Sequence, residues 1–154
     1  MDIDKLFGLP AHPLMVHVPV VLTPLAAAGA IVMVLVPRLR AQLRWFVVGA
    51  AVVATIGTQL AIGSGQKLQQ RIDNSRALAE HARLARDARP LVALFALSLI
   101  GFVLVLRRTA PSPLLVRAAA GATVITAVVA TVWMVRTGHQ GALATWKGVG
   151  IRNG

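Results

Sequence analysis

Four histidines are the residues of this chain whose side chains can do chemistry near neutral pH. Imidazole binds zinc, copper and iron, and it supplies axial ligands to heme iron. The chain contains no cysteine, which excludes disulfides, thiolate metal sites and iron–sulfur clusters. The candidate ligands are therefore His12, His17, His81 and His139.

The spacing of His12 and His17 predicts that only one of them faces a common site. A separation of five residues turns the chain by about 140° around an α-helix, provided that the helix is regular across Pro13. His17 lies about one turn inside the first apolar stretch, where an imidazole is costly unless it has a partner. We expect His17 to be a ligand, and His12 to lie at the interface or to contact a heme propionate.

The second ligand is expected to be His81 or His139. If the last helix runs deep, Arg136 and His139 share one face of it, and two potential cations there need an anion. A heme propionate, Glu80 or Asp87 could provide that charge. Arg136 therefore joins the histidines as a candidate cofactor-binding residue.

Two kinds of cofactor fit these residues. Imidazoles directed from two helices into a bundle core can hold heme b through its axial positions. At closer range His17, His81 and His139 could instead bind a transition metal such as zinc, copper or iron. Spacing alone leaves both alternatives open.

The composition indicates which elements position these side chains. Hydrophobic residues make up 56% of the 154 residues and charged residues only 14%, which is typical of an integral membrane protein. Four apolar stretches are long enough to cross a hydrocarbon layer of about 30 Å as helices. We expect an all-α fold, a single-domain transmembrane four-helix bundle over residues 1–154. The predicted helices cover residues 13–36, 45–63, 90–106 and 114–135.

The outer loop of residues 64–89 is expected to contain an amphipathic helix. Leu78, Ala82 and Ala85 recur at helical spacing among basic residues, so this helix should lie at the surface or be continuous with the third span. Pro90 should mark a bend or a helix start. The basic residues would attract lipid headgroups, or form a lid that brings His81 over the site and docks an acidic partner.

Arginines predict the orientation in the membrane. The connections between the first and second spans and between the third and fourth carry arginines and no acid, so we expect them in the cytoplasm. Both termini, the outer loop and all four histidines then lie outside a bacterial plasma membrane. The net charge of +11 is split between two faces, so no nucleic acid is expected as a partner.

Small residues predict close helix packing. They cluster in residues 26–30 of the first span, 49–57 of the second and 118–122 of the fourth. Such faces also make a homodimer plausible.

Several motifs resemble those of the small four-helix bacterial membrane proteins grouped as the DUF2231 family. The opening places His12-Pro13 before His17 and Pro19, and the closing motif contains Gly138-His139. Weaker similarity covers residues 62–65, His81 and residues 148–150, so that the resemblance spans nearly the whole chain. The family looks like the b-type cytochrome bundles, and related domains are fused to Rieske iron–sulfur domains, which implies electron transfer. Where a further histidine is expected, this chain has Trp146-Lys147.

Three function classes remain. The first is a heme b electron-transfer protein that passes electrons between a quinol or membrane partner and an outer-face acceptor. The second is a histidine-based binding protein for zinc, copper or iron, and the third is a structural accessory subunit of a larger membrane complex. No hydrolytic motif is present and no carboxylate lies within a span, so any enzymatic activity would be that of an oxidoreductase.

Overall fold

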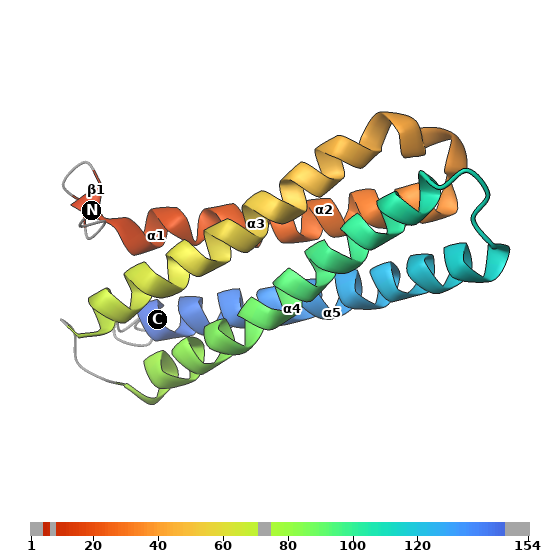
Figure 1. The fold of residues 1–154 in the computed structure, drawn as a ribbon. Helices are drawn as coiled ribbons and strands as arrows, with labels where there is room; N and C mark the ends of the chain where they lie inside the picture. Colours follow the sequence, from red (N-terminus) through yellow and green to blue (C-terminus); the bar gives the residue numbers. More distant parts are fainter. Residues whose placement is uncertain (1–4, 7–8, 71–74, 147–154) are drawn as a thin grey trace, which may run out of the picture.

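The computed structural model of the chain describes residues 5–6, 9–70 and 75–146. Four long helices run antiparallel in it, and each is long and apolar enough to cross a membrane (Figure 1). The predicted all-α transmembrane four-helix bundle is thereby confirmed. The helices are α1 (Ala11–Met15), α2 (His17–Leu35), the 3-10 helix η1 (Pro37–Leu39), α3 (Arg40–Gln69), α4 (Arg76–Leu106) and α5 (Pro113–Trp146). Two short strands, β1 (Lys5–Leu6) and β2 (Leu9–Pro10), pair in front of α1.

The helices are longer than the apolar stretches that predicted them. α3 continues to Gln69 and α4 begins at Arg76, so most of the expected outer loop of residues 64–89 is helical. The predicted amphipathic segment is the first half of α4, continuous with the third span, and Pro90 lies inside this helix. Ser75 caps α4, its Oγ accepting a hydrogen bond of 3.1 Å from the backbone N–H of Leu78. Hydropathy marks only the part of a helix that lipid surrounds, whereas helix-forming residues extend it into water.

The first span is interrupted immediately before His17. α1 ends at Met15, and α2 begins at His17 after the turn at Val16. Pro19 has no backbone N–H to donate to the carbonyl of Met15, which removes a helical hydrogen bond at this point. The backbone still stays helical here, because Val16 has φ and ψ of -67° and -24° and its N–H donates to the carbonyl of His12 at 3.1 Å.

Small residues bring α2 and α3 into close contact. A Cβ added at Gly29 would lie 2.6 Å from Cγ2 of Val47, and one added at Gly57 would lie 2.7 Å from Cγ1 of Val18. Alanines of both helices are buried here, as their sequence predicted. In residues 118–122 of α5 the same expectation holds only for Ala119 and Ala120, which are half-buried and pack against the core, and the other three residues are exposed. The buried small residues of that helix lie further along, at Ala127 and Ala130.

Large side chains of α4 fill the centre of the bundle. Phe95, Leu99 and Phe102 are fully buried, together with Met33 of α2. In contrast, many large apolar side chains face outward, among them Leu35, Leu114 and Ile125. Such exposure on every side is expected of helices surrounded by lipid.

Both described ends of the chain, the C-terminal end of α3 and the N-terminal end of α4 lie at one end of the bundle (Figure 1). The connections between α2 and α3 and between α4 and α5 lie at the other. All four histidines belong to the first end, because each is near the N-terminus of α2 or α4 or near the C-terminus of α5.

Candidate histidine site

His12 and His81 face each other at this end of the bundle. Their ring centroids are 6.2 Å apart, and the ring planes are inclined by 73°. His12 comes from α1 and His81 from the first turns of α4, and both side chains are half-buried. The structure thus brings together two imidazoles from separate segments of the chain.

A backbone carbonyl of α3 holds the ring of His12. Nδ1 lies 2.9 Å from the carbonyl oxygen of Ala61, and 3.3 Å from Oγ of Ser64. The Ser64 hydroxyl itself donates to the same carbonyl at 3.0 Å. Since a carbonyl oxygen only accepts hydrogen bonds, Nδ1 of His12 carries a proton and donates it.

A backbone carbonyl of α5 holds the ring of His81 in the same manner. Nδ1 lies 2.9 Å from the carbonyl oxygen of Thr137. One turn earlier, the indole N–H of Trp133 donates to the carbonyl of Leu84 at 3.2 Å, and the Thr137 hydroxyl donates to the carbonyl of Trp133 at 2.9 Å. The bonds of His81 and Trp133 join α4 to α5 and fix their relative rotation, whereas the Thr137 hydroxyl bond lies within α5.

A glycine beside each ring leaves room for it. Gly65 follows Ala61 by four residues, and a Cβ added there would lie 2.8 Å from Cε1 of His12. Gly141 follows Thr137 by four residues, and a Cβ added there would lie 3.0 Å from Cε1 of His81. Each imidazole therefore lies against a helix, between a carbonyl that orients it and a glycine one turn further on.

This arrangement leaves the same atom available on both rings. A neutral imidazole that donates from Nδ1 has its lone pair on Nε2, which is the nitrogen it can offer to a metal. A hydrogen bond from the other nitrogen to a carbonyl is the usual way that proteins orient an imidazole ligand and make it more basic. Both side chains thus have the tautomer that coordination of a metal or heme iron needs.

The separation of the rings also suits one shared metal. At a metal–nitrogen distance of about 2.1 Å each ring centre lies roughly 3 Å from the metal, so two opposed rings lie roughly 6 Å apart. Among the described residues, no group of three or more His, Cys, Asp or Glu side chains could hold a metal ion. A zinc site needs three or four protein ligands, whereas heme iron needs at most two because the porphyrin brings four nitrogens of its own.

The other predicted site residues lie outside this pair. His17 is exposed, and its Nδ1 donates to the carbonyl of Pro13 in its own segment at 2.6 Å. His139 is exposed on α5. We expected His17 to pair with His81 or His139, but the structure brings His12 together with His81. Five residues turn a helix by about 140°, so His17 points away from the ring that His12 meets. Whether any of these histidines is a ligand stays a prediction.

Arg136 lies on the surface next to the site. Its guanidinium carbon is 5.2 Å from the ring centroid of Trp133, which places the charge over the indole face. Glu80, one of the two carboxylates expected nearby, is within electrostatic reach of Arg136 and forms an ion pair with Arg83 at 2.6 Å. The Arg136 side chain is exposed on α5, and its role at a cofactor stays a prediction.

Comparison with protein families agrees with the motifs at both ends of the chain. The family described as predicted membrane protein (DUF2231) matches residues 8–153. The chain belongs to this family. No curated protein and no solved structure matches it. The closing glycine motif of residues 148–150 and Lys147, which entered the resemblance, lie outside the described residues.

The residues of this DUF2231 member that sequence reasoning missed are those that position the rings. Ala61 and Thr137 contribute through backbone carbonyls, which no side-chain pattern reveals. Gly65 and Gly141 had a weak signal, since each ends a segment of small and polar residues near one end of a span. Their spacing of four residues from the accepting carbonyls becomes meaningful only once the partner histidines are known.

Proposed function

We propose that this chain is a heme b-binding electron-transfer protein of the membrane, with His12 and His81 as the axial ligands. One observation supports the proposal above the others: two imidazoles from separate segments face each other at 6.2 Å, each with Nδ1 donating to a backbone carbonyl. A heme held there would supply one-electron chemistry. This assignment replaces His17 by His12 in the expected ligand pair.

The residues of the chain would perform three tasks. The carbonyls of Ala61 and Thr137 hold both rings in one tautomer and increase the basicity of Nε2. Gly65 and Gly141 let the rings approach α3 and α5. The exposed cation Arg136, close to the pair, is available to a propionate.

The position of the site at one end of the bundle supports electron exchange with a partner outside the hydrocarbon layer. The arginine-rich connections lie at the opposite end, and by their charge we place that end in the cytoplasm. The histidine pair would then lie near the outer face, where a quinol in the membrane and an acceptor outside it can both approach.

The test is a dithionite-reduced minus oxidised absorption spectrum of the full-length protein, purified in detergent after expression with added heme. We expect a sharp α-band in the wild type, its loss in His12→Ala and His81→Ala, and its retention in His17→Ala and His139→Ala. Addition of imidazole to the His81→Ala protein should restore part of the band, because free imidazole can fill the vacated position.

Other outcomes lead to the remaining classes. A flat spectrum from folded, heme-supplied protein would refute the heme assignment. Stoichiometric zinc, copper or iron lost on mutation of His12 or His81 would then identify a metal-binding protein. If the protein contains neither heme nor a metal, the histidine pair would only stabilise helix packing in an accessory subunit.

A further inference from the structure

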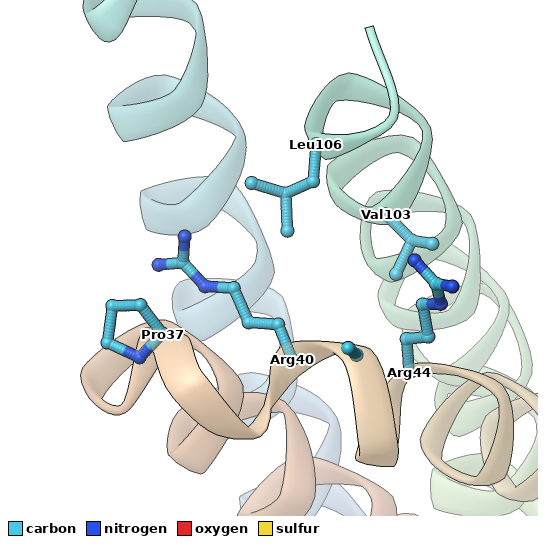
Figure 2. A pocket seen from close by; sticks show the side chains of 6 residues that line it. Pro37, Arg40, Arg44, Val103 and Leu106 are labelled. Atoms are coloured by element: carbon cyan, nitrogen blue, oxygen red, sulfur yellow. The ribbon is translucent and has the colours of Figure 1, made fainter.

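The end of the bundle opposite the histidines contains a cavity lined by arginines. It has a volume of about 280 Å³ and is bounded by Pro37, Arg40, Ala41, Arg44, Val103 and Leu106. Figure 2 shows Arg40 and Arg44 extending from α3 on either side of it, towards the C-terminal end of α4. The volume is close to the lower end of the range for small-ligand sites, about 300 Å³.

Arg40 is fixed at the cavity by its neighbours. Nε donates to the carbonyl of Met33 at 2.8 Å and one terminal nitrogen donates to the carbonyl of Val34 at 3.2 Å, which caps the last turn of α2. The guanidinium carbon also lies 5.6 Å from the ring centroid of Phe102. A guanidinium has five N–H donors, so Arg40 retains donors for a ligand after these two bonds.

Arg44 has hydrogen-bonding capacity that the protein does not use. Its Nε is buried, and no hydrogen-bond partner for it is found in the described part of the chain. The guanidinium carbon lies 5.8 Å from the ring centroid of Trp45, and that of Arg107 approaches the same ring at 5.7 Å. A buried donor without an acceptor costs free energy, and two cations at one ring repel each other, so an anion would relieve both.

The surrounding charges are all positive. Arg38 and Arg108 add to Arg40, Arg44 and Arg107, and the sequence has no acidic residue between residues 5 and 72 or after residue 87. The first turn of α3 contains no acidic residue and no side-chain cap, so the positive end of the helix dipole is not neutralised by a side chain. This end of the molecule therefore favours a ligand with net negative charge.

The location indicates that the anion belongs to a lipid. Leu35, Trp45 and Phe46, at the ends of α2 and α3, are 72%, 56% and 64% exposed and present an apolar surface beside the cavity. An exposed tryptophan beside arginines at a span end is typical of the headgroup layer. A phospholipid would place its phosphate near the arginines while its acyl chains cover the apolar side chains.

We propose that this cavity binds the phosphate of an anionic phospholipid through Arg40 and Arg44. Arg40 contributes the donors left free by its capping bonds, and Arg44 contributes its positive charge and its terminal nitrogens. Basic sites between transmembrane helices on the cytoplasmic side are suited to such headgroups.

Native mass spectrometry of the detergent-purified, full-length chain tests the proposal by titration with phosphatidylglycerol or phosphatidylcholine of the same acyl chains. We expect phosphatidylglycerol to bind about tenfold more tightly, and Arg44→Gln to reduce that affinity about tenfold, as loss of a charged hydrogen bond predicts. The control Arg117→Gln removes an exposed arginine of α5 that does not line the cavity, and it should bind phosphatidylglycerol like the wild type.

Other results would overturn the proposal. These are equal binding of the two lipids, or equal losses in Arg44→Gln and Arg117→Gln. Displacement of phosphatidylglycerol by millimolar inorganic phosphate would indicate a site for the free anion instead. The melting temperature without added lipid checks that the variants fold. If Arg44→Gln does not fold, Arg44→Lys replaces it. We expect Arg44→Lys to lower the affinity for phosphatidylglycerol a few fold, because lysine keeps the charge but lacks the planar guanidinium donors.

Discussion

Replacement of Gly65 by alanine should remove the support of the His12 ring. The added Cβ would lie 2.8 Å from Cε1 of His12, whereas two carbon atoms favour a separation of about 3.5–4.0 Å. The ring must then move by roughly 0.7 Å or more away from α3. That movement stretches the 2.9 Å bond between Nδ1 and the carbonyl of Ala61 beyond the range of a hydrogen bond.

The expected effect on stability follows from three contributions. Loss of the hydrogen bond costs about 1 kcal/mol and local overpacking costs about 1–3 kcal/mol. The higher helix propensity of alanine offsets about 0.5–1 kcal/mol of this. The net destabilisation is about 1–3 kcal/mol, which corresponds to a decrease in melting temperature of roughly 3–10 °C for a chain of this size.

Gly63→Ala is the matched control, because a Cβ at that position of the same helix would meet no atom within 4 Å. Thermal unfolding of both variants in the same detergent should give a melting temperature at or above that of the wild type for Gly63→Ala and a lower one for Gly65→Ala. If Gly65→Ala melts at or above Gly63→Ala, the ring is not held against α3 as described and the reasoning is wrong.

Three further predictions concern the bundle. Phe95→Ala removes a fully buried ring and should destabilise the protein by about 3–5 kcal/mol, measured by unfolding in detergent mixtures. Ser98→Ala removes the 2.7 Å bond to the Thr126 hydroxyl between α4 and α5, and the same assay should give a loss of only about 0.5–1 kcal/mol. Arg83→Gln breaks exposed ion pairs with Glu80 and Asp87, and should leave the melting temperature unchanged within error at 150 mM salt.

The sequence was sufficient to predict the four helices and the helical character of the outer loop, because span length and amphipathic spacing are local properties. It did not predict which histidine faces inward. A membrane helix is apolar on both its lipid-facing and its protein-facing sides. The distribution of apolar residues therefore does not reveal which side faces the bundle. The spacing of five residues predicted that His12 and His17 point in different directions, and the choice of His17 depended on its depth in the membrane. Depth does not show which side of a helix faces the bundle.

The small residues likewise show that sequence alone does not predict which side of a membrane helix packs against another helix. Alanines near Gly29 and Gly57 pack as expected because α2 and α3 approach closely there, whereas in residues 118–122 only Ala119 and Ala120 pack against the core. Carbonyl acceptors such as Ala61 and Thr137 are invisible to sequence reasoning for a different reason. Every residue carries that group, and only the assembled fold decides which one a ring will meet.

Because the chain is synthesised from its N-terminus, the two carbonyl contacts can form at different stages of membrane insertion. Ala61 is within reach of His12 as soon as the first helical hairpin has entered the membrane, whereas Thr137 reaches His81 only after the last helix, α5, has been inserted. A nascent or truncated chain that ends before α5 would therefore have one oriented imidazole and one that is not held. A ligand that needs both rings would therefore bind only after all four long helices have been inserted, and its binding would indicate that insertion of the described helices is complete.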